Sequence, residues 1–127
     1  MTSLKLPSRI CVFLGSARRD LIAFPEQVRA DVGYALHEVQ RGSEPYSAKS
    51  LKGFGGRGVL ELIENHDGNT YRAVYTVRLE GFVYVLHCFQ KKSVTGVATP
   101  QKDIELIKSR LRMAEADFAA RKAGRKP

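Results

Sequence analysis

Three pairs of basic residues and one histidine are of the types that can act on a phosphodiester. Attack of a ribose 2′-hydroxyl on the adjacent phosphate needs a base, cations around the phosphate oxygens and an acid for the departing 5′ oxygen. Lysine and arginine supply positive charge, a lysine crowded by other cations can exchange protons, and histidine titrates near neutral pH. The pattern therefore predicts RNA cleavage without a metal or cofactor. The residues are Lys49 and Lys52, Arg72 and Arg78, Lys91 and Lys92, and His87.

Each of these residues also has a purely structural interpretation. His87 lies in the apolar run VLHCF, where a histidine is commonly a hydrogen-bonded core group. Arg72 and Arg78 can form an ordinary solvated face of a sheet, and Lys91 with Lys92 can end a strand and discourage edge pairing. These alternatives stay open at the level of the sequence.

The composition favours one folded domain with a polyanionic partner. The chain has 127 residues, of which 43% are hydrophobic and 27% charged, an ordinary globular mixture. There are 21 lysines and arginines against 13 aspartates and glutamates, so the net charge is +8. Such an excess points to nucleic acid, an acidic protein or an anionic membrane surface as the partner.

Several other classes of protein are disfavoured. No apolar run is long enough to span a bilayer, and residues 1–7 lack the apolar region of a secretory signal, so we expect a cytoplasmic protein. Cys11 and Cys88 lie in apolar runs and are expected to be reduced. The three histidines are far apart, which disfavours a zinc site, and the glycines of residues 53–58 lack the following Gly-Lys-Ser/Thr of a phosphate loop.

The hydrophobic periodicity predicts an α+β fold. We expect a domain over residues 1–120, in which an N-terminal helical pair and a C-terminal helix pack on a small twisted, mainly antiparallel sheet. Residues 121–127 form a basic C-terminal tail that we expect to be flexible. The expected strands are residues 10–14, 58–64, 71–79 and 82–90; the expected helices are 20–24, 25–41 and 100 to about 120; residues 42–58 are expected to be a loop.

The expected strands place the basic residues on one surface. Strict alternation puts Arg72 on the face opposite Tyr71, and gives Val83, Val85, His87, Phe89 and Lys91 a common parity. A hairpin about Glu80-Gly81 brings Arg72 roughly opposite His87, and Lys91-Lys92 close to the turn at residues 67–69. If the loop folds back over this face, Lys52 and Arg57 join the same basic patch.

Four short motifs, in this order, carry a resemblance to a known family. They are LKG at residues 51–53, YRxxY at 71–75, HxFxKK at 87–92 and Thr99-Pro100. Together they resemble the phage-derived HigB-like toxins of the RelE/ParE superfamily, over about residues 7–118. The resemblance implies a RelE-like fold and the toxin of a type II toxin–antitoxin pair, typically a ribosome-dependent mRNA endonuclease that inhibits translation. It also implies a helix-turn-helix antitoxin as partner. The toxin would contact operator DNA only through this antitoxin.

The same resemblance assigns roles to particular residues. Lys52, Arg72, Lys91 and Lys92 match basic positions of the family's motifs, and His87 matches a motif position, so these five are the candidate catalytic residues. The basic residues of the loop and strands, independently of the resemblance, add Lys49, Arg57 and Arg78 as candidate nucleic-acid-binding residues. The strand at residues 59–64 lacks the arginine that relatives carry after a Glu-Leu pair; Arg57 is the candidate substitute.

Three functions remain in competition at this point. The first is the mRNA endonuclease, acting on the ribosome. The second is a ParE-like inhibitor of DNA gyrase, which needs no basic catalytic cluster. The third is a catalytically inactive toxin fold that only binds an antitoxin or RNA.

Overall fold

The computed structural model describes residues 8–56, 58–91 and 99–124 of the chain. It is an α+β protein with an N-terminal helical pair and a C-terminal helix on a mainly antiparallel sheet, as the periodicity predicts. No helix among the described residues is long and apolar enough to cross a membrane. The elements are β1 (Ile10–Phe13), α1 (Ala17–Ile22), α2 (Glu26–Gln40), β2 (Ala48–Ser50), β3 (Val59–His66), β4 (Asn69–Thr76), β5 (Phe82–Lys91) and α3 (Gln101–Gly124).

The sheet has the strand order β1-β5-β4-β3-β2. β1 pairs with β5 in parallel, and the other neighbours are antiparallel. The expected loop at residues 42–58 contains one strand that the sequence did not indicate, because β2 pairs with β3 through only Ala48, Lys49 and Ser50. A strand this short shows no alternation of polar and apolar residues from which it could be predicted.

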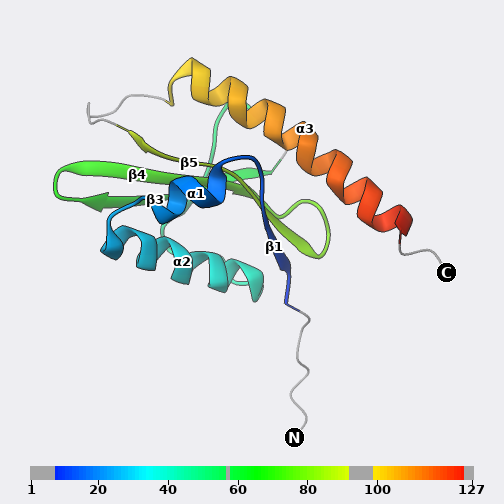
Figure 1. The fold of residues 1–127 in the computed structure, drawn as a ribbon, viewed down its shortest axis with the longest axis horizontal. Coiled ribbons are helices and arrows are strands. Elements are labelled where there is room, and N and C mark those ends of the chain that lie inside the picture. The colour runs from blue at the N-terminus through cyan, green and yellow to red at the C-terminus, as the bar shows by residue number, and fades with distance from the viewer. Residues whose placement is uncertain (1–7, 57, 92–98, 125–127) are drawn as a thin grey trace, which may run out of the picture.

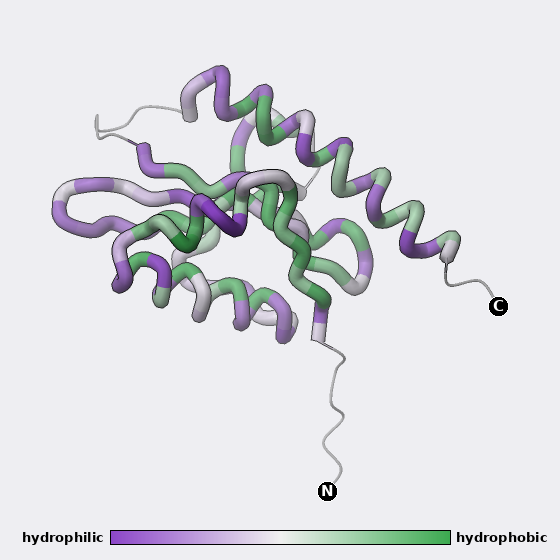
Figure 2. The backbone as a smooth tube through the Cα atoms, viewed as in Figure 1, coloured by the Kyte–Doolittle hydropathy of each residue, from purple (hydrophilic) through white to green (hydrophobic). Residues whose placement is uncertain are grey.

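The helices cover the two faces of the sheet, and each face carries its own core (Figure 1). On one face, Val28, Val32 and Leu36 of α2 pack against strand residues such as Leu62 and Val85. On the other face, the α3 residues Ile107, Leu111 and Ala114 pack against Val59, Val74, Tyr84 and Leu86. Figure 2 shows hydrophobic residues along the inner strands and a mixture of both kinds along α3.

The alternation predicted for β4 is confirmed, whereas that predicted for β5 is wrong beyond Val85. Tyr71, Ala73 and Tyr75 belong to the core beneath α1 and α2, and Val74 belongs to the core beneath α3. On β5, Val74 faces His87 and Tyr75 faces Val85, so Leu86 has no partner across the ladder and forms a β-bulge. The extra residue reverses the alternation, so His87, Phe89 and Lys91 lie on the α3 face while Val83 and Val85 lie on the other.

α3 continues beyond the end expected at about residue 120. It reaches Gly124, so Arg121 and Lys122 belong to the helix. The remaining basic residues of the expected tail, Arg125 and Lys126, lie outside the described residues.

The core beneath α3 predicts a contrast between two residues of this helix. Ile107 is fully buried, whereas the Met113 side chain is about half exposed. We expect Ile107→Ala to lower the free energy of unfolding by about 2–5 kcal/mol, because it leaves a cavity. Met113→Ala is the matched control and should change it by less than about 0.5 kcal/mol. Chemical denaturation measures both; equal effects would contradict the described packing of α3.

Candidate functional site

A groove of about 730 Å³ lies where the α3 face of the sheet meets the start of α3 and the segment after β2. Its positive charges come from three elements: Lys49 on β2 with Lys52 just after it, Arg72 on β4, and Lys108 on α3. Leu51, Ile63 and Ile104 add apolar surface. The remaining lining residues are Ser50, Gly53, Glu61, Thr99 and Gln101.

Arg72 and Glu61 form an ion pair within this groove. Nη1 of Arg72 donates to Oε1 of Glu61 at 2.7 Å, and both side chains are largely buried. The residues occupy neighbouring strands in diagonal positions, since Arg72 pairs with Ile63 and Glu61 with Val74. Nε of Arg72 is buried and has no partner within the described residues, so the ion pair leaves one donor of the guanidinium unsatisfied.

Lys91 is a buried cation close to this pair. It lies opposite Thr70, two residues along β5 from Phe89, the partner of Arg72. Burial lowers the pKa of Lys91 below its ordinary value of 10.5, and the positive charge of Arg72 lowers it further, while the carboxylate of Glu61 acts in the opposite direction. A lysine in such surroundings gives up a proton more readily than a solvated one.

His87 does not line the groove. Its Nε2 lies 2.8 Å from Oδ1 of Asp103 on α3, and its ring stacks on Phe89 with centroids 4.6 Å apart. Its Nδ1 is buried without a partner among the described residues. The contact with Asp103 links β5 to the first turn of α3, the same turn that supplies Gln101 and Ile104 to the groove.

The structure thus brings together four of the predicted residues: Lys49, Lys52 and Arg72 line the groove and Lys91 lies beside it. Arg78 lies elsewhere, beyond the end of β4, where its side chain occupies the space in which any Cβ at Gly58 would fall. Arg57 and Lys92 lie outside the described residues.

Two charged residues of the groove, Glu61 and Lys108, are absent from the sequence-based prediction. Glu61 lies between apolar residues of β3 and looks like an outward-facing residue of an alternating strand. Lys108 follows Ile104 by one helical turn, so both project from the same side of α3. That spacing is a signal that could have found Lys108; nothing comparable identifies Glu61.

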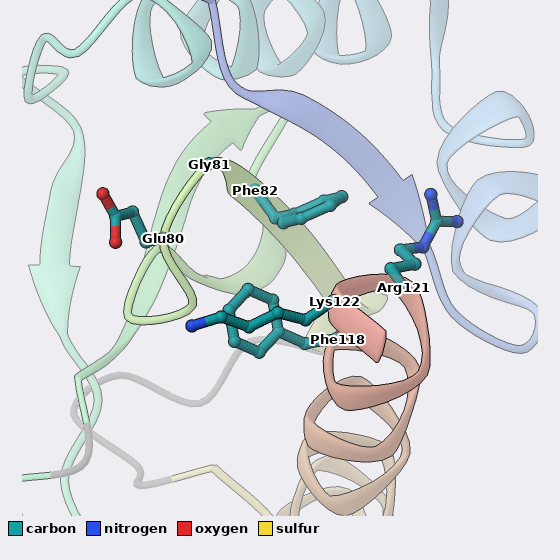
Figure 3. A pocket seen from close by; sticks show the side chains of 6 residues that line it. All are labelled: Glu80, Gly81, Phe82, Phe118, Arg121 and Lys122. Atoms are coloured by element: carbon teal, nitrogen blue, oxygen red, sulfur yellow. The ribbon is translucent and has the colours of Figure 1, made fainter. Parts of the chain in front are cut away.

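A second hollow lies at the other end of α3, by the turn between β4 and β5 (Figure 3). The Phe82 and Phe118 rings meet edge to face, with centroids 5.8 Å apart. Arg121 lies 5.4 Å from the Phe82 ring and Lys122 lies 5.6 Å from the Phe118 ring. Asp117 accepts hydrogen bonds from Arg121 and from the Tyr84 hydroxyl. Arg121 thereby connects the end of α3 to Phe82 of the sheet, whereas Lys122 and Phe118 both belong to α3.

No group of three or more histidine, cysteine, aspartate or glutamate side chains that could hold a metal ion occurs within residues 8–56, 58–91 and 99–124. The charged side chains that line the groove carry ammonium, guanidinium and carboxylate groups.

The chain is similar to a known protein family and to solved structures. The family model described as phage derived protein Gp49-like (DUF891) matches residues 19–112. A mutant of the Escherichia coli toxin RelE in the free state is 20% identical, with a TM-score of 0.51 over 64% of this chain and 81% of that one. The toxin–antitoxin complex RelBE2 from Mycobacterium tuberculosis has a chain that is 23% identical, with a TM-score of 0.47 over 66% of this chain and 99% of that one. No curated protein matches the sequence.

The contacts of Asp117 predict a dependence of stability on pH. Hydrogen bonds from Tyr84 and Arg121 hold the pKa of Asp117 below its ordinary value of 3.8. The ionised carboxylate therefore stabilises the fold above pH 3.8, and this contribution is lost as the pH falls through the lower pKa of the folded state. We expect Asp117→Asn to lower the melting temperature at pH 7 and to lessen the loss of stability between pH 4 and 2, relative to the wild type. Thermal unfolding at a series of pH values measures both effects. Identical dependence of the melting temperature on pH in the two proteins would contradict a stabilising role of the Asp117 carboxylate.

Proposed function

The chain belongs to the phage-derived Gp49-like family, and we propose that it is the toxin of a toxin–antitoxin pair, an endoribonuclease that cleaves mRNA on the ribosome. The RelE-like fold supports this proposal. We also propose that it belongs to the HigB-like toxins. The partners would be an antitoxin and the translating ribosome, and the site of action the cytoplasm, where ribosomes are.

The observation that carries the proposal is the convergence of four cations on one groove that also contains an ionic carboxylate. Lys49 and Lys52 come from β2 and the residues just after it, Arg72 from β4 and Lys108 from α3, so their meeting at one place is a property of the fold. Positive charge on three sides suits a single nucleic-acid strand, whose phosphates would lie between the sheet and α3. The apolar side chains of Ile63 and Ile104 offer contact to a base or ribose.

The arrangement suits cleavage by the neighbouring 2′-hydroxyl. Glu61, the acidic residue lining the groove, would take the 2′-hydroxyl proton as the O2′–P bond forms. Arg72, which lines the groove beside Glu61, and Lys52 would stabilise the charge that grows on the phosphate oxygens. Lys91, whose pKa is lowered, would give a proton to O5′ as the P–O5′ bond breaks. The products would be a 2′,3′-cyclic phosphate and a 5′-hydroxyl end.

We assign His87 a supporting part in this mechanism. Its pairing with Asp103 and its burial against Phe89 suit a residue that holds α3 in place over the sheet. Lys92 and Arg57 remain candidates for phosphate contacts on the sequence motifs alone, and Arg78 for a contact with more distant nucleic acid.

Expression of the chain in cells without an antitoxin tests the proposed function. We expect growth arrest and new transcript 5′ ends at in-frame positions within translated codons. Arrest with intact transcripts and broken DNA would instead identify a gyrase inhibitor. Normal growth with unchanged transcripts would leave a binding protein without toxic activity. Either of these two results would overturn the nuclease proposal.

Substitution of Arg72 tests the site. Arg72→Lys keeps a positive charge beside Glu61 but loses the planar fork that can donate to the carboxylate and to a phosphate together. We expect cleavage on purified translating ribosomes to fall by about 10²-fold, the usual range for losing one donor to a developing oxyanion.

The matched control for this substitution is Arg41→Lys. Arg41 is exposed at the end of α2, on the opposite side of the sheet. We expect this variant to cleave at the wild-type rate. Equal rates for both variants, at equal melting temperatures, would show that Arg72 takes no part in the reaction.

A further inference from the structure

β5 changes the face that it presents to α3 within one residue. Leu86 packs in the core beneath α3, and the next residue, His87, contacts Asp103 of the same helix. Two consecutive side chains on one face are the signature of a β-bulge, and the register places it here. Without the bulge, strict alternation would turn His87 and Lys91 toward the core beneath α1 and α2.

Arg110 of α3 holds the backbone at this bulge. Its Nη1 donates to the Leu86 carbonyl at 2.9 Å, and its Nη2 donates to Ser16 Oγ at 3.1 Å. The Ser16 hydroxyl in turn donates to Oδ2 of Asp20 at 2.7 Å. Arg110 is itself buried, with 9% of its surface exposed. The bulge carbonyl, which the ladder cannot satisfy in the ordinary way, thus has a charged partner.

The chain before α1 is shaped to admit this side chain. Gly15 has a φ of +54°, and a Cβ at this position would lie 2.8 Å from the Arg110 guanidinium. Any larger residue would therefore meet both backbone strain and a clash with the guanidinium. Gly15 leaves room for the Arg110 guanidinium, and Ser16 accepts a hydrogen bond from it, between the end of β1 and the start of α1.

Arginine is suited to this place because it can bridge two acceptors with separate nitrogens. A lysine would keep the charge but offers one ammonium group in place of the fork. An uncharged residue would leave the Leu86 carbonyl without its partner in a buried region. The geometry therefore ties the identity of Arg110 to the shape of β5.

We propose that Arg110 is a positioning residue for the groove: by holding the Leu86 carbonyl it fixes the β-bulge that turns His87 and Lys91 to the side of Arg72. The placement of Lys91 as a proton donor rests on the proposed function, whereas the structural effect on β5 does not. Arg110 itself does not line the groove.

The test compares Arg110→Lys with Arg112→Lys, a control at an exposed position of the same helix. NMR on the full-length protein would record the contact between the His87 ring and the Asp103 side chain, and the pKa of Lys91. In Arg110→Lys we expect the His87–Asp103 contact to be lost and the pKa of Lys91 to rise toward 10.5, as Lys91 moves away from Arg72. Cleavage on ribosomes should fall at least tenfold. The Arg112→Lys control should match the wild type in the His87–Asp103 contact, the pKa of Lys91 and the rate of cleavage.

A folded Arg110→Lys protein with an unchanged His87–Asp103 contact and an unchanged pKa of Lys91 would overturn the proposal. If this variant does not fold, Ser16→Ala decides in its place, because it removes one acceptor of Arg110 and leaves the guanidinium. In Ser16→Ala, a weakened His87–Asp103 contact and a smaller rise in the pKa of Lys91 would support the proposal. The absence of both changes would overturn it. If the wild type does not cleave RNA yet the NMR changes occur, the positioning role stands and the nuclease proposal fails.

Discussion

The ion pair between Glu61 and Arg72 lets one face of the sheet carry both a hydrophobic core and a charged groove. Arg72 is largely buried, and a buried charge without a partner is costly. Glu61 accepts a hydrogen bond from Nη1 of Arg72 and so supplies the partner of this guanidinium at the groove. α3 spans both regions, because Ile107 and Leu111 seal the core while Ile104 and Lys108 line the groove. The charged and apolar halves of this face therefore depend on one another.

The elements with a strong hydrophobic period could be predicted from the sequence. The spacing of Val28, Val32 and Leu36 predicted α2, and the alternation about Arg72 predicted the two faces of β4. The bulge at Leu86 could not be predicted, because β5 is buried on both faces from Phe82 to Cys88 and apolar there except at His87, so its sequence shows no alternation whose break would mark the bulge. Its cause lies in a long-range contact, from Arg110 to the Leu86 carbonyl, that no local pattern records.

Only those residues of the candidate site whose chemical type stands out in the sequence could be predicted. Lysines and arginines beside glycine-rich or strand sequences stand out, so Lys49, Lys52 and Arg72 could be assigned to a basic surface. Glu61 could not, since its importance arises from the register between β3 and β4, which sets it diagonally across from Arg72. His87 had the right chemistry in the sequence, but its burial and its contact with Asp103 were decided by the packing of α3.

The most direct measurement of the central claim is a map of where a single RNA strand binds. A short RNA with 2′-O-methyl groups cannot undergo attack by its own 2′ oxygen, so it can be titrated into isotope-labelled protein and followed by NMR. We expect the largest shifts at Lys52, Arg72 and Lys108, around the groove. Shifts centred on Phe118 and Lys122 instead, with the groove signals unchanged, would contradict it.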